Sequence, residues 1–406
     1  MAIHDDLAGA CSHLRGAGPG DAVDGVDPQW VVSPSTTAET AEVMRICARH
    51  DLAVVTRGHG TKLSWGRPPT RVDIILETTR MNQVVEHVAG DLVVVAQAGL
   101  RITDLEEHLG RADQHLSLDQ PAAGATLGGT VATATSGPRR MGTGSVRDLI
   151  IGITMVRADG VVAKAGGKVV KNVAGYDLAK LLTGSFGTLA VITQVAFRLH
   201  HRPLSSRWVH RSVTDVQAAR ATVARVLHSQ VAPVALEVDW PLDGPGRVAV
   251  LIEGAPAGID ERAHGVAALL GGDTETADDG PPWRAVYPWT ADEVALKLTT
   301  QLSSVPDLLS DARRHGVAVR GSAGTGVLYG ALPGDVDAGT AGKAVTALRN
   351  ACVATGGSLT VLDAPADLKA GLDLWGEVHG LALMHQVKDQ FDPGHRLSPG
   401  RFVGGI

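Results

Sequence analysis

Apolar and polar positions in the first part of the chain follow the periods of strands and helices in turn. Residues 30–32 and 52–56 are short apolar runs typical of buried strands. Between them, Val43, Met44 and Cys47 recur at helical spacing, after threonines that can cap a helix. Glycines follow the second run directly. The order of strand, helix, strand and glycine turn predicts an α/β beginning.

The same reading continues along the rest of the chain. Apolar runs predict further strands at residues 71–78, 91–100, 148–157, 160–165, 188–199, 247–254, 317–321 and 358–363. Helical spacing predicts helices at residues 102–110, 177–183, 258–270, 304–315, 336–354 and 375–390. From these runs, residues 206–333 read as an independent α+β unit of about four strands and about two helices.

Length and composition narrow the class of protein. A chain of 406 residues is too long for one ordinary core and indicates two or three domains. Its net charge of −6 gives no case for nucleic acid or an anionic membrane as a partner. No apolar run approaches the ~18 residues of a spanning helix, and the start lacks the basic and apolar segments of a secretory signal. We expect a soluble, cytoplasmic protein.

The three cysteines, Cys11, Cys47 and Cys352, are far apart in the sequence. They form no C-x-x-C motif and no disulfide framework. An iron–sulfur cluster usually takes four thiolates, so the chain cannot hold one by itself. If this protein handles single electrons, it passes them to another protein.

Three glycine-rich stretches between residues 56 and 193 are the candidate chemistry. They read "TRGHGTKL" (56–63), "GATLGGTVATATSGPRR" (124–140) and "GSFGTLAVIT" (184–193). Glycines let backbone N–H groups converge on phosphate oxygens, and short hydroxyls add donors. One such stretch alone is an ordinary turn, and none matches the Rossmann or Walker A pattern. Together they predict a site for a flat, anionic cofactor; Arg139 and Arg140 could assist it or form a solvated basic pair.

These stretches resemble the FAD-binding domain of the vanillyl-alcohol oxidase superfamily, which has the PCMH-type fold. The resemblance spans residues 25–200 and includes the tail "FDPGHRLSPGR". The phrase "KVVKNVAGYDLAKLLTGSFG" (168–187) is similar to the FAD-binding E subunits of bacterial glycolate oxidase/dehydrogenase. The fold implied is α+β. It comprises a PCMH-type domain of two α/β subdomains (1–203), a smaller α+β cap domain (204–335) and a C-terminal helical segment returning to the FAD domain (336–406).

The resemblance implies a set of FAD contacts. The pyrophosphate loop would be Arg57, Gly58, His59, Gly60, Thr61, Lys62 and Leu63. Beside the diphosphate and the ring would lie Gly124, Thr126, Gly128, Gly129, Thr133, Thr135, Ser136, Gly137 and Pro138. The adenine and ribose side would meet Gly187, Leu189, Val191 and Ile192. The isoalloxazine would lie near Lys171, Asn172 and Gly175, with Arg401 approaching its other side.

Two departures from related motifs carry further expectations. Some members of the superfamily attach FAD through the histidine of R-x-G-G-H, a position that Thr61 occupies here, so the resemblance implies non-covalent FAD with His59 contributing only its backbone. Catalytic hydroxyacid dehydrogenases carry H-x-G-D-G-N-x-H in the cap domain. The nearest stretch, "SAGTGVLY" (322–329), has Ser322, Thr325, Val327 and Tyr329 at the ligand positions, and these cannot replace imidazole or carboxylate ligands. No metal site is expected.

Three functions follow from the resemblance. The first is an FAD-binding subunit of a glycolate (2-hydroxyacid) oxidase/dehydrogenase complex that works with a catalytic flavoprotein subunit and an iron–sulfur subunit. Such a complex would use a small 2-hydroxyacid and would meet the inner face of the membrane only through partners. The second is a stand-alone dehydrogenase, with Lys171, Tyr176 and Arg401 as candidate catalytic groups. The third is a scaffold whose FAD is structural.

Overall fold

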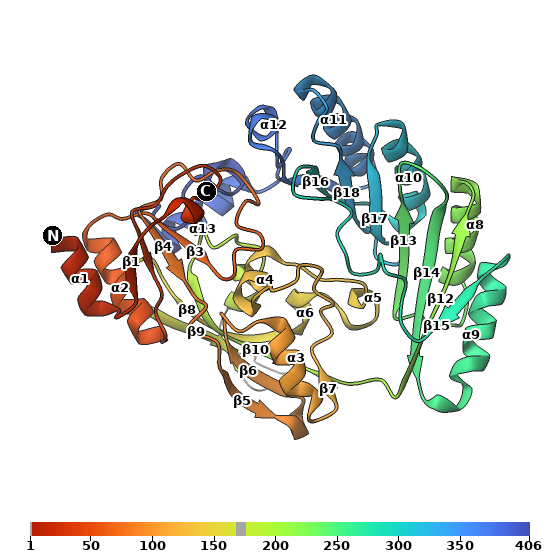
Figure 1. The fold of residues 1–406 in the computed structure, drawn as a ribbon, viewed down its shortest axis with the longest axis horizontal. Coiled ribbons are helices and arrows are strands. Elements are labelled where there is room, and N and C mark those ends of the chain that lie inside the picture. The colour runs from red at the N-terminus through yellow and green to blue at the C-terminus, as the bar shows by residue number, and fades with distance from the viewer. Residues whose placement is uncertain (1, 168–175) are drawn as a thin grey trace. The chain divides into compact units, whose positions relative to one another are not determined.

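The computed structural model describes residues 2–167 and 176–406, which divide into two compact units (Figure 1). Unit 1 consists of Met1–Thr135, Ser145–Arg202 and Val378–Ile406, and unit 2 of Ser136–Gly144 and Pro203–Glu377. No helix of the described residues is both long and apolar enough to cross a membrane.

The first sheet of unit 1 has the strand order β1-β2-β4-β3. Its strands span Leu14–Gly16 (β1), Trp30–Val32 (β2), Ile74–Glu77 (β4) and Val54–Arg57 (β3). Strand β4 pairs in parallel with both β2 and β3. Helices α1 (Ala2–Ala10) and α2 (Thr37–Arg49) pack with it, and η1 spans Pro19–Asp21. The predicted helical face is confirmed, because Val43, Met44 and Cys47 are fully buried, and Thr36 Oγ1 caps α2 by accepting from Glu39 N at 3.1 Å.

The second sheet of unit 1 is antiparallel, with the order β5-β6-β10-β8-β9. Its strands span Val84–Val88, Val93–Gln97, Val191–Arg198, Ile150–Val156 and Val162–Gly166 in that order. The accompanying helices are α3 (Ile102–Gly110), α4 (Leu127–Thr133), α6 (Val146–Leu149), α7 (Leu178–Leu182) and the 3-10 turn η2 (Ala89–Asp91). A separate two-stranded sheet is formed by β7 (Gln114–His115) and β11 (His200–His201), which pair antiparallel. The strands predicted at residues 148–157 and 160–165 are confirmed as β8 and β9, which pair antiparallel across a turn at Gly160 with a φ of +80°.

The chain returns to unit 1 at its end through α13 (Leu381–Phe391) and η4 (Val403–Gly405). The tail runs beside β3, where Val54 N donates to Arg396 O and Ser398 N donates to Val54 O, both at 2.8 Å. Lys388 and Asp392 are fully buried, with Nζ 2.7 Å from Oδ2. The same ammonium donates to Thr188 O at 2.8 Å and Leu397 O at 3.0 Å, and so ties α13 to two loops.

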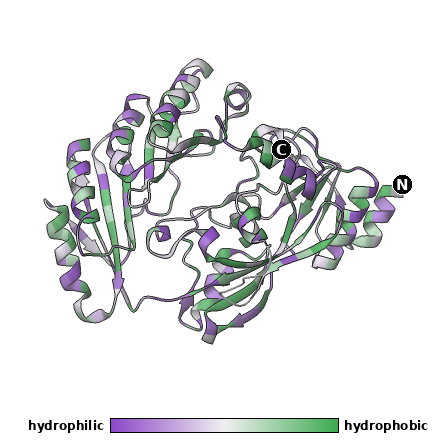
Figure 2. Ribbon diagram, turned by 180° about the vertical axis from the view of Figure 1, so that it is seen from behind, coloured by the Kyte–Doolittle hydropathy of each residue, from purple (hydrophilic) through white to green (hydrophobic). Residues whose placement is uncertain are grey.

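Unit 2 is one antiparallel sheet of eight strands with the order β15-β12-β14-β13-β17-β18-β16-β19. The strands span Glu275–Ala277, Ser205–Val213, Gly246–Gly254, Ala235–Trp240, Ala318–Ser322, Val327–Leu332, Val294–Thr299 and Ser358–Asp363 in that order. Its helices are α5 (Arg140–Thr143), α8 (Val216–Leu227), α9 (Pro256–Leu270), η3 (Leu302–Ser304), α10 (Val305–Arg314), α11 (Ala338–Ala354) and α12 (Ala366–Gly371). Helices α8 to α11 share one apolar core with the sheet, so they cover one of its faces. Figure 2 shows mostly hydrophobic strands and helices of mixed hydropathy, as an amphipathic cover requires.

The observed division differs from the expected one at the last boundary. Strand β19 pairs with β16 in the register Lys297 to Thr360, so the chain up to Glu377 belongs to unit 2 and only Val378–Ile406 returns to unit 1. Residues 205–332 hold seven strands, β12 to β18, where about four were expected in residues 206–333. The helix expected from residue 375 begins at Leu381. Gly376 and Gly380 have φ angles of +70° and +80°, which are not helical, so the helix can start only after Gly380.

Ser136, Gly137 and Pro138, which were expected beside the cofactor, belong to the segment Ser136–Gly144 of unit 2. Gly142 N donates to Val234 O at 3.1 Å. Arg139 Nε lies 2.7 Å from a carboxylate oxygen of Glu253. Arg139 is therefore an ion-pairing residue of unit 2.

We predict that Lys388→Met lowers the free energy of unfolding of unit 1 by about 3–5 kcal/mol, because it leaves the Asp392 carboxylate buried without its cation. The matched control is Lys180→Met. Lys180 Nζ lies 3.1 Å from Asp177 in a pair that is about half exposed, and its loss should cost less than about 1 kcal/mol. Urea denaturation of the three proteins measures both changes. Equal losses in the two variants would contradict the role given to Lys388.

Candidate functional site

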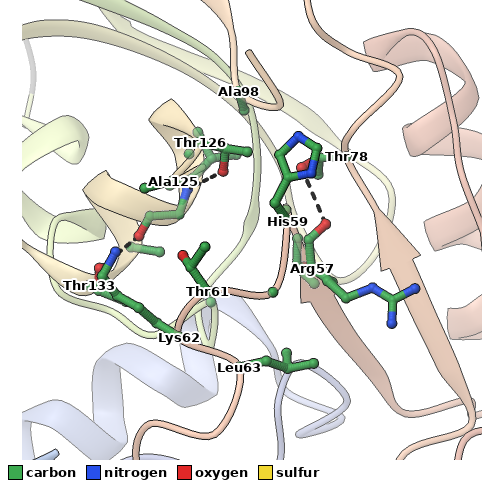
Figure 3. A pocket seen from close by; sticks show the side chains of 18 of the residues that line it. Arg57, His59, Thr61, Lys62, Leu63, Thr78, Ala98, Ala125, Thr126 and Thr133 are labelled. Carbon is green, nitrogen blue, oxygen red and sulfur yellow. Dashed lines mark hydrogen bonds between the residues drawn. The ribbon is translucent and has the colours of Figure 1, made fainter. Parts of the chain in front are cut away.

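A cavity that is partly open to solvent lies in unit 1 where the three glycine-rich stretches meet (Figure 3). Its walls come from the loop after β3, from the start of α4 and from the segment before β10.

The loop after β3 approaches α4 closely. A Cβ atom on Gly58 would lie 2.4 Å from Thr126 Oγ1, so no other residue fits there without movement. Gly60 has a φ of +76°, and its carbonyl accepts from Leu63 N at 3.1 Å. Glycine at both positions lets the backbone of residues 58–61 line the cavity without side chains in the way.

Helix α4 is placed by a second close contact. Gly128 N donates to Ala98 O at 2.7 Å, and a Cβ atom on Gly128 would lie 2.8 Å from Ala98 Cβ. Thr126 Oγ1 accepts from Gly129 N at 3.2 Å and caps the helix. Thr133 Oγ1 donates to Gly129 O at 2.8 Å. The hydroxyls expected as cofactor donors therefore already order the wall of the cavity.

The third wall is the turn at Phe186 and Gly187, which have φ angles of +54° and +72°. Phe186 N donates to Ala132 O at 2.9 Å, which fixes the turn against the end of α4. The Phe186 ring stacks on Phe402 with centroids 5.3 Å apart. Phe186 lines the cavity in a backbone conformation that is strained for a residue other than glycine. It was not predicted as a site residue from the sequence.

The two basic side chains of the first loop differ in their partners. The Arg57 guanidinium lies 2.9 Å from Asp21 and 2.8 Å from Glu77, so its charge is balanced within the fold. Lys62 lines the cavity, and its Nζ lies 5.6 Å from the centroid of the Trp65 ring. Burial lowers the pKa of Lys62 to about 8. Across residues 2–167 and 176–406, no carboxylate lies within ion-pair distance of Lys62, so its charge is available to an anionic ligand.

His59 is held as a neutral imidazole. Its Nε2 accepts a hydrogen bond from Arg101 Nε at 3.0 Å, a role that requires an unprotonated nitrogen. Burial and then the Arg101 charge lower the pKa of His59. The Nε2 atom of His59 is therefore already engaged by Arg101.

The cavity brings together many of the predicted contacts. Those that line it are Arg57, Gly58, His59, Gly60, Thr61, Lys62, Leu63, Thr126, Gly128, Gly129, Thr133, Gly187, Ile192 and Arg401. Those that do not line it are Gly124, Thr135, Ser136, Gly137, Pro138, Leu189 and Val191. Val191 instead packs in the core of unit 1. Lys171, Asn172 and Gly175 lie outside the described residues.

The remaining candidate catalytic groups have different surroundings. The Tyr176 side chain is 92% exposed and does not line the cavity. Arg401 is buried, and its Nη2 donates to Trp65 O at 2.8 Å and also to Leu63 O. This guanidinium therefore stabilises the loop after β3 by binding two of its carbonyl oxygens. Lining residues that were not predicted are Thr56, Thr78, Ala98, Ala132 and Phe186, whereas Ala125 and Ala190 lie within the predicted stretches.

The stretch at residues 322–329 forms the end of β17, a turn and the start of β18 in unit 2. Ser322, Thr325, Val327 and Tyr329 offer no imidazole or carboxylate there. In the part of the chain that the structure describes, no three His, Cys, Asp or Glu side chains gather closely enough to hold a metal ion.

Comparison with known proteins agrees with this geometry. Residues 28–166 match the family described as FAD binding domain. Glycolate oxidase subunit GlcD of Bacillus subtilis is 31% identical over 247 residues, 60% of this chain and 51% of that protein. Glycolate oxidase subunit GlcE of Escherichia coli is 36% identical over 173 residues, 42% of this chain and 49% of that protein. The chain thus spans about half the length of these curated relatives.

The solved structure of p-cresol methylhydroxylase with substrate bound is similar over most of both chains. The TM-score is 0.75 at 14% identity, covering 98% of this chain and 96% of that one. At this identity the likeness shows the fold, and it confirms the expected PCMH-type fold.

We predict that Gly58→Ala raises the dissociation constant for FAD at least about tenfold, because the added methyl would collide with Thr126 Oγ1 and displace the loop. Gly20→Ala is the matched control, since no atom lies within 4 Å of a Cβ there. Fluorescence titration of the flavin-free proteins measures both. Normal affinity in Gly58→Ala would contradict the close contact.

We predict that FAD affinity falls about tenfold between pH 7 and pH 9. The Lys62 side chain, with its pKa of about 8, loses its proton over this range. Because the FAD diphosphate binds the protonated ammonium, binding above pH 8 requires the uptake of a proton and is weakened accordingly. Lys62→Arg should bind FAD with no such pH dependence, and Lys62→Met should bind weakly at every pH. The measurement is the same titration at several pH values. An unchanged pH profile in Lys62→Arg would show that another group is responsible.

Proposed function

We propose that this chain, whose residues 28–166 match the FAD binding domain family, is a subunit of a flavin-dependent oxidoreductase that acts on small 2-hydroxyacids. The observation that carries the proposal is the cavity of unit 1, where glycine backbone converges with Lys62, which has no carboxylate partner among the described residues. The names of the relatives, which are glycolate oxidase subunits, support the substrate class.

The residues of the cavity fit FAD. The amides of residues 58–61 and the Lys62 ammonium would hold the diphosphate, because both offer positive charge and the described residues that line the cavity include no acidic side chain. The Phe186–Gly187 turn would contact the adenine and ribose side. When bound, FAD accepts a hydride from the carbon that bears the hydroxyl. The protein's part is to bind, orient and shield that ring.

We propose that the FAD is held without a covalent bond. Thr61 stands where a histidine attaches the flavin in some members of the superfamily, and its hydroxyl cannot play that part. The neighbouring His59 already accepts a hydrogen bond from Arg101.

We further propose the role of an E-type subunit, which works with a catalytic flavoprotein subunit and an iron–sulfur subunit. The three cysteines support it, since all are buried and burial raises the pKa of Cys47 to about 12 and that of Cys352 to about 11. Such thiols are poor cluster ligands. An iron–sulfur centre that receives the electrons would therefore belong to another chain.

A stand-alone dehydrogenase is the second candidate. The observation in its favour is a pair of cations in unit 2, Lys297 and Arg140, that have no carboxylate partner among the described residues. A subunit that never meets an acid substrate has no need of them.

Anaerobic stopped-flow absorbance of the FAD-loaded chain mixed with glycolate tests the role. For an E-type subunit, we predict that the oxidised-flavin band persists with the chain alone and bleaches when the partner subunits are added, because substrate oxidation begins elsewhere. Reduction by dithionite in the same cell controls for an inaccessible flavin. Rapid bleaching by the chain alone would establish the stand-alone dehydrogenase, and a band that persists with all subunits present would make the flavin structural.

A further inference from the structure

Part of the first sheet lies before the residues that match the FAD binding domain family, which begin at residue 28. This part, residues 14–26, contains β1 and the 3-10 turn η1. Its Val23 packs with Val55 of β3 and Ile75 of β4 on one face of the sheet. Residues 14–26, here called the N-terminal segment, therefore cover one face of the sheet that carries the cofactor loop.

Arg57 and Glu77 project from the face that the N-terminal segment covers. They lie opposite each other in the parallel pair of β3 and β4, two residues after Val55 and Ile75. Side chains alternate between the two faces of a strand, so all four point to the same side. Figure 3 shows the Arg57 guanidinium directed away from Thr126, which lies across the cavity. The Arg57 side chain is therefore directed toward the N-terminal segment.

Asp21 of the N-terminal segment binds the far end of Arg57. Its side chain is 6% exposed and accepts four hydrogen bonds. Arg15 donates through Nη1 at 2.6 Å and Nη2 at 2.8 Å, Gly18 N donates at 2.9 Å, and Arg57 Nη2 donates at 2.9 Å. The hydrogen bond from Arg15, above all, lowers the pKa of Asp21 well below its usual range. Asp21 is therefore a charged acceptor that Arg15 and Gly18 hold in one position.

Glu77 binds the same guanidinium from the neighbouring strand. Arg57 Nε donates to Glu77 Oε2 at 3.2 Å, and Arg57 Nη2 donates to the same oxygen at 2.8 Å. Thr79 Oγ1 donates to the other carboxylate oxygen at 2.9 Å. The network of Arg15, Asp21, Arg57 and Glu77 has two positive and two negative groups, so it carries no net charge. The Arg57 guanidinium is thus fixed by two carboxylates, and its charge is balanced before any ligand binds.

The network is joined to the cofactor loop through Arg57 itself. The Arg57 carbonyl accepts from Thr78 N at 2.8 Å, and Gly58 follows Arg57 directly. A Cβ atom on Gly60 would lie 3.8 Å from Arg57 Cδ, so the stem of the arginine packs against the loop at van der Waals distance. Because Gly58 already lies against Thr126, a displacement of the Arg57 side chain changes the conformation of the loop.

We propose that Asp21 and Arg57 are positioning residues of the cofactor site. Asp21 holds the Arg57 guanidinium, and Arg57 holds residues 58–61 in the conformation that a bound diphosphate requires. The N-terminal segment is therefore part of the site, although it lies outside the family match. This role rests on the proposed function for FAD as the ligand. Arg57 then supports the loop, in place of the direct contact that the resemblance implies.

Fluorescence titration of the flavin-free chain with FAD, well below its melting temperature, tests the role of Asp21. Asp21→Asn should raise the dissociation constant about tenfold, because a neutral amide holds the guanidinium more weakly and the loop loses its position. A direct ligand of the diphosphate would behave in the opposite way, since the substitution releases the Arg57 charge toward the cavity. Tighter or unchanged FAD binding by Asp21→Asn would therefore overturn the proposal.

Asp73→Asn is the matched control. Asp73 directly precedes β4 at the other end of that strand, and its side chain is 16% exposed. It accepts from Ala53 N at 2.7 Å and lies 3.0 Å from Arg71 Nε, so its partners are of the same kind as those of Asp21. Asp73→Asn should lower the melting temperature and still bind FAD as the wild type does. A loss of affinity equal to that in Asp21→Asn would overturn the specific role of Asp21.

Two further variants separate positioning from folding. Arg57→Met should weaken FAD at least as much as Asp21→Asn does, and the double variant should bind no more weakly than Arg57→Met, because both changes break the same contact. Losses that multiply in the double variant would contradict this coupling. Arg15→Met, whose side chain is about half exposed, should weaken FAD to a smaller degree and takes the place of Asp21→Asn if that variant does not fold. Unchanged affinity in Arg15→Met would then overturn the proposal.

Hydrogen–deuterium exchange of the flavin-free chain measures the order of the loop without any ligand. In Asp21→Asn, the amides of residues 58–61 should exchange at least about threefold faster than in the wild type. Asp73→Asn should show no such change, and unit 2 should exchange equally in all three proteins. A wild-type chain that binds no FAD, with this exchange pattern intact, would refute only the proposed function. A chain that binds FAD but whose loop exchanges equally in Asp21→Asn would refute only the positioning role.

Discussion

The geometry of unit 1 depends on two close approaches between backbone segments. Gly58 lies against Thr126, and Gly128 lies against Ala98, at separations that leave no room for a Cβ atom. These contacts bring the loop after β3, the start of α4 and the end of β6 to one point and create the cavity between them. The glycines therefore serve packing first, and the exposed backbone that results is what a phosphate-bearing cofactor can use. Structure and candidate function rest on the same residues.

Three lysines show how the chain distributes its charge. Lys388 is fully buried and satisfied by Asp392 and two carbonyls, so it holds the returning C-terminal segment in place. Lys62 and Lys297 have lowered pKa values of about 8 and no carboxylate partner among the described residues. A paired buried charge can fix structure, whereas an unpaired one costs stability and is explained best by a ligand. Both unpaired lysines lie beside aromatic rings, Trp65 in unit 1 and Tyr329 in unit 2.

Local features of the fold could be predicted from the sequence, and long-range pairings could not. The helix at residues 102–110 matches α3, and the glycine pattern located the loops of the cavity, because both depend on neighbouring residues alone. The assignment of β19 to unit 2 depends on pairing with β16, about sixty residues away, which no local pattern encodes. Phe186 was missed because an ordinary aromatic residue gives no sign of a positive φ. The unpaired state of Lys297 is likewise visible only once the strands are in register.

Hydrogen–deuterium exchange of the flavin-free chain, with and without added FAD, tests the central claim most directly. We predict that FAD slows exchange in residues 57–63, in residues 126–133 and at the Phe186–Gly187 turn, where backbone lines the cavity. Exchange on the sheet of unit 2 far from those segments should change little by comparison. Slower exchange confined to unit 2, with the three glycine-rich segments of unit 1 unaffected, would contradict the assignment of the cavity as the FAD site.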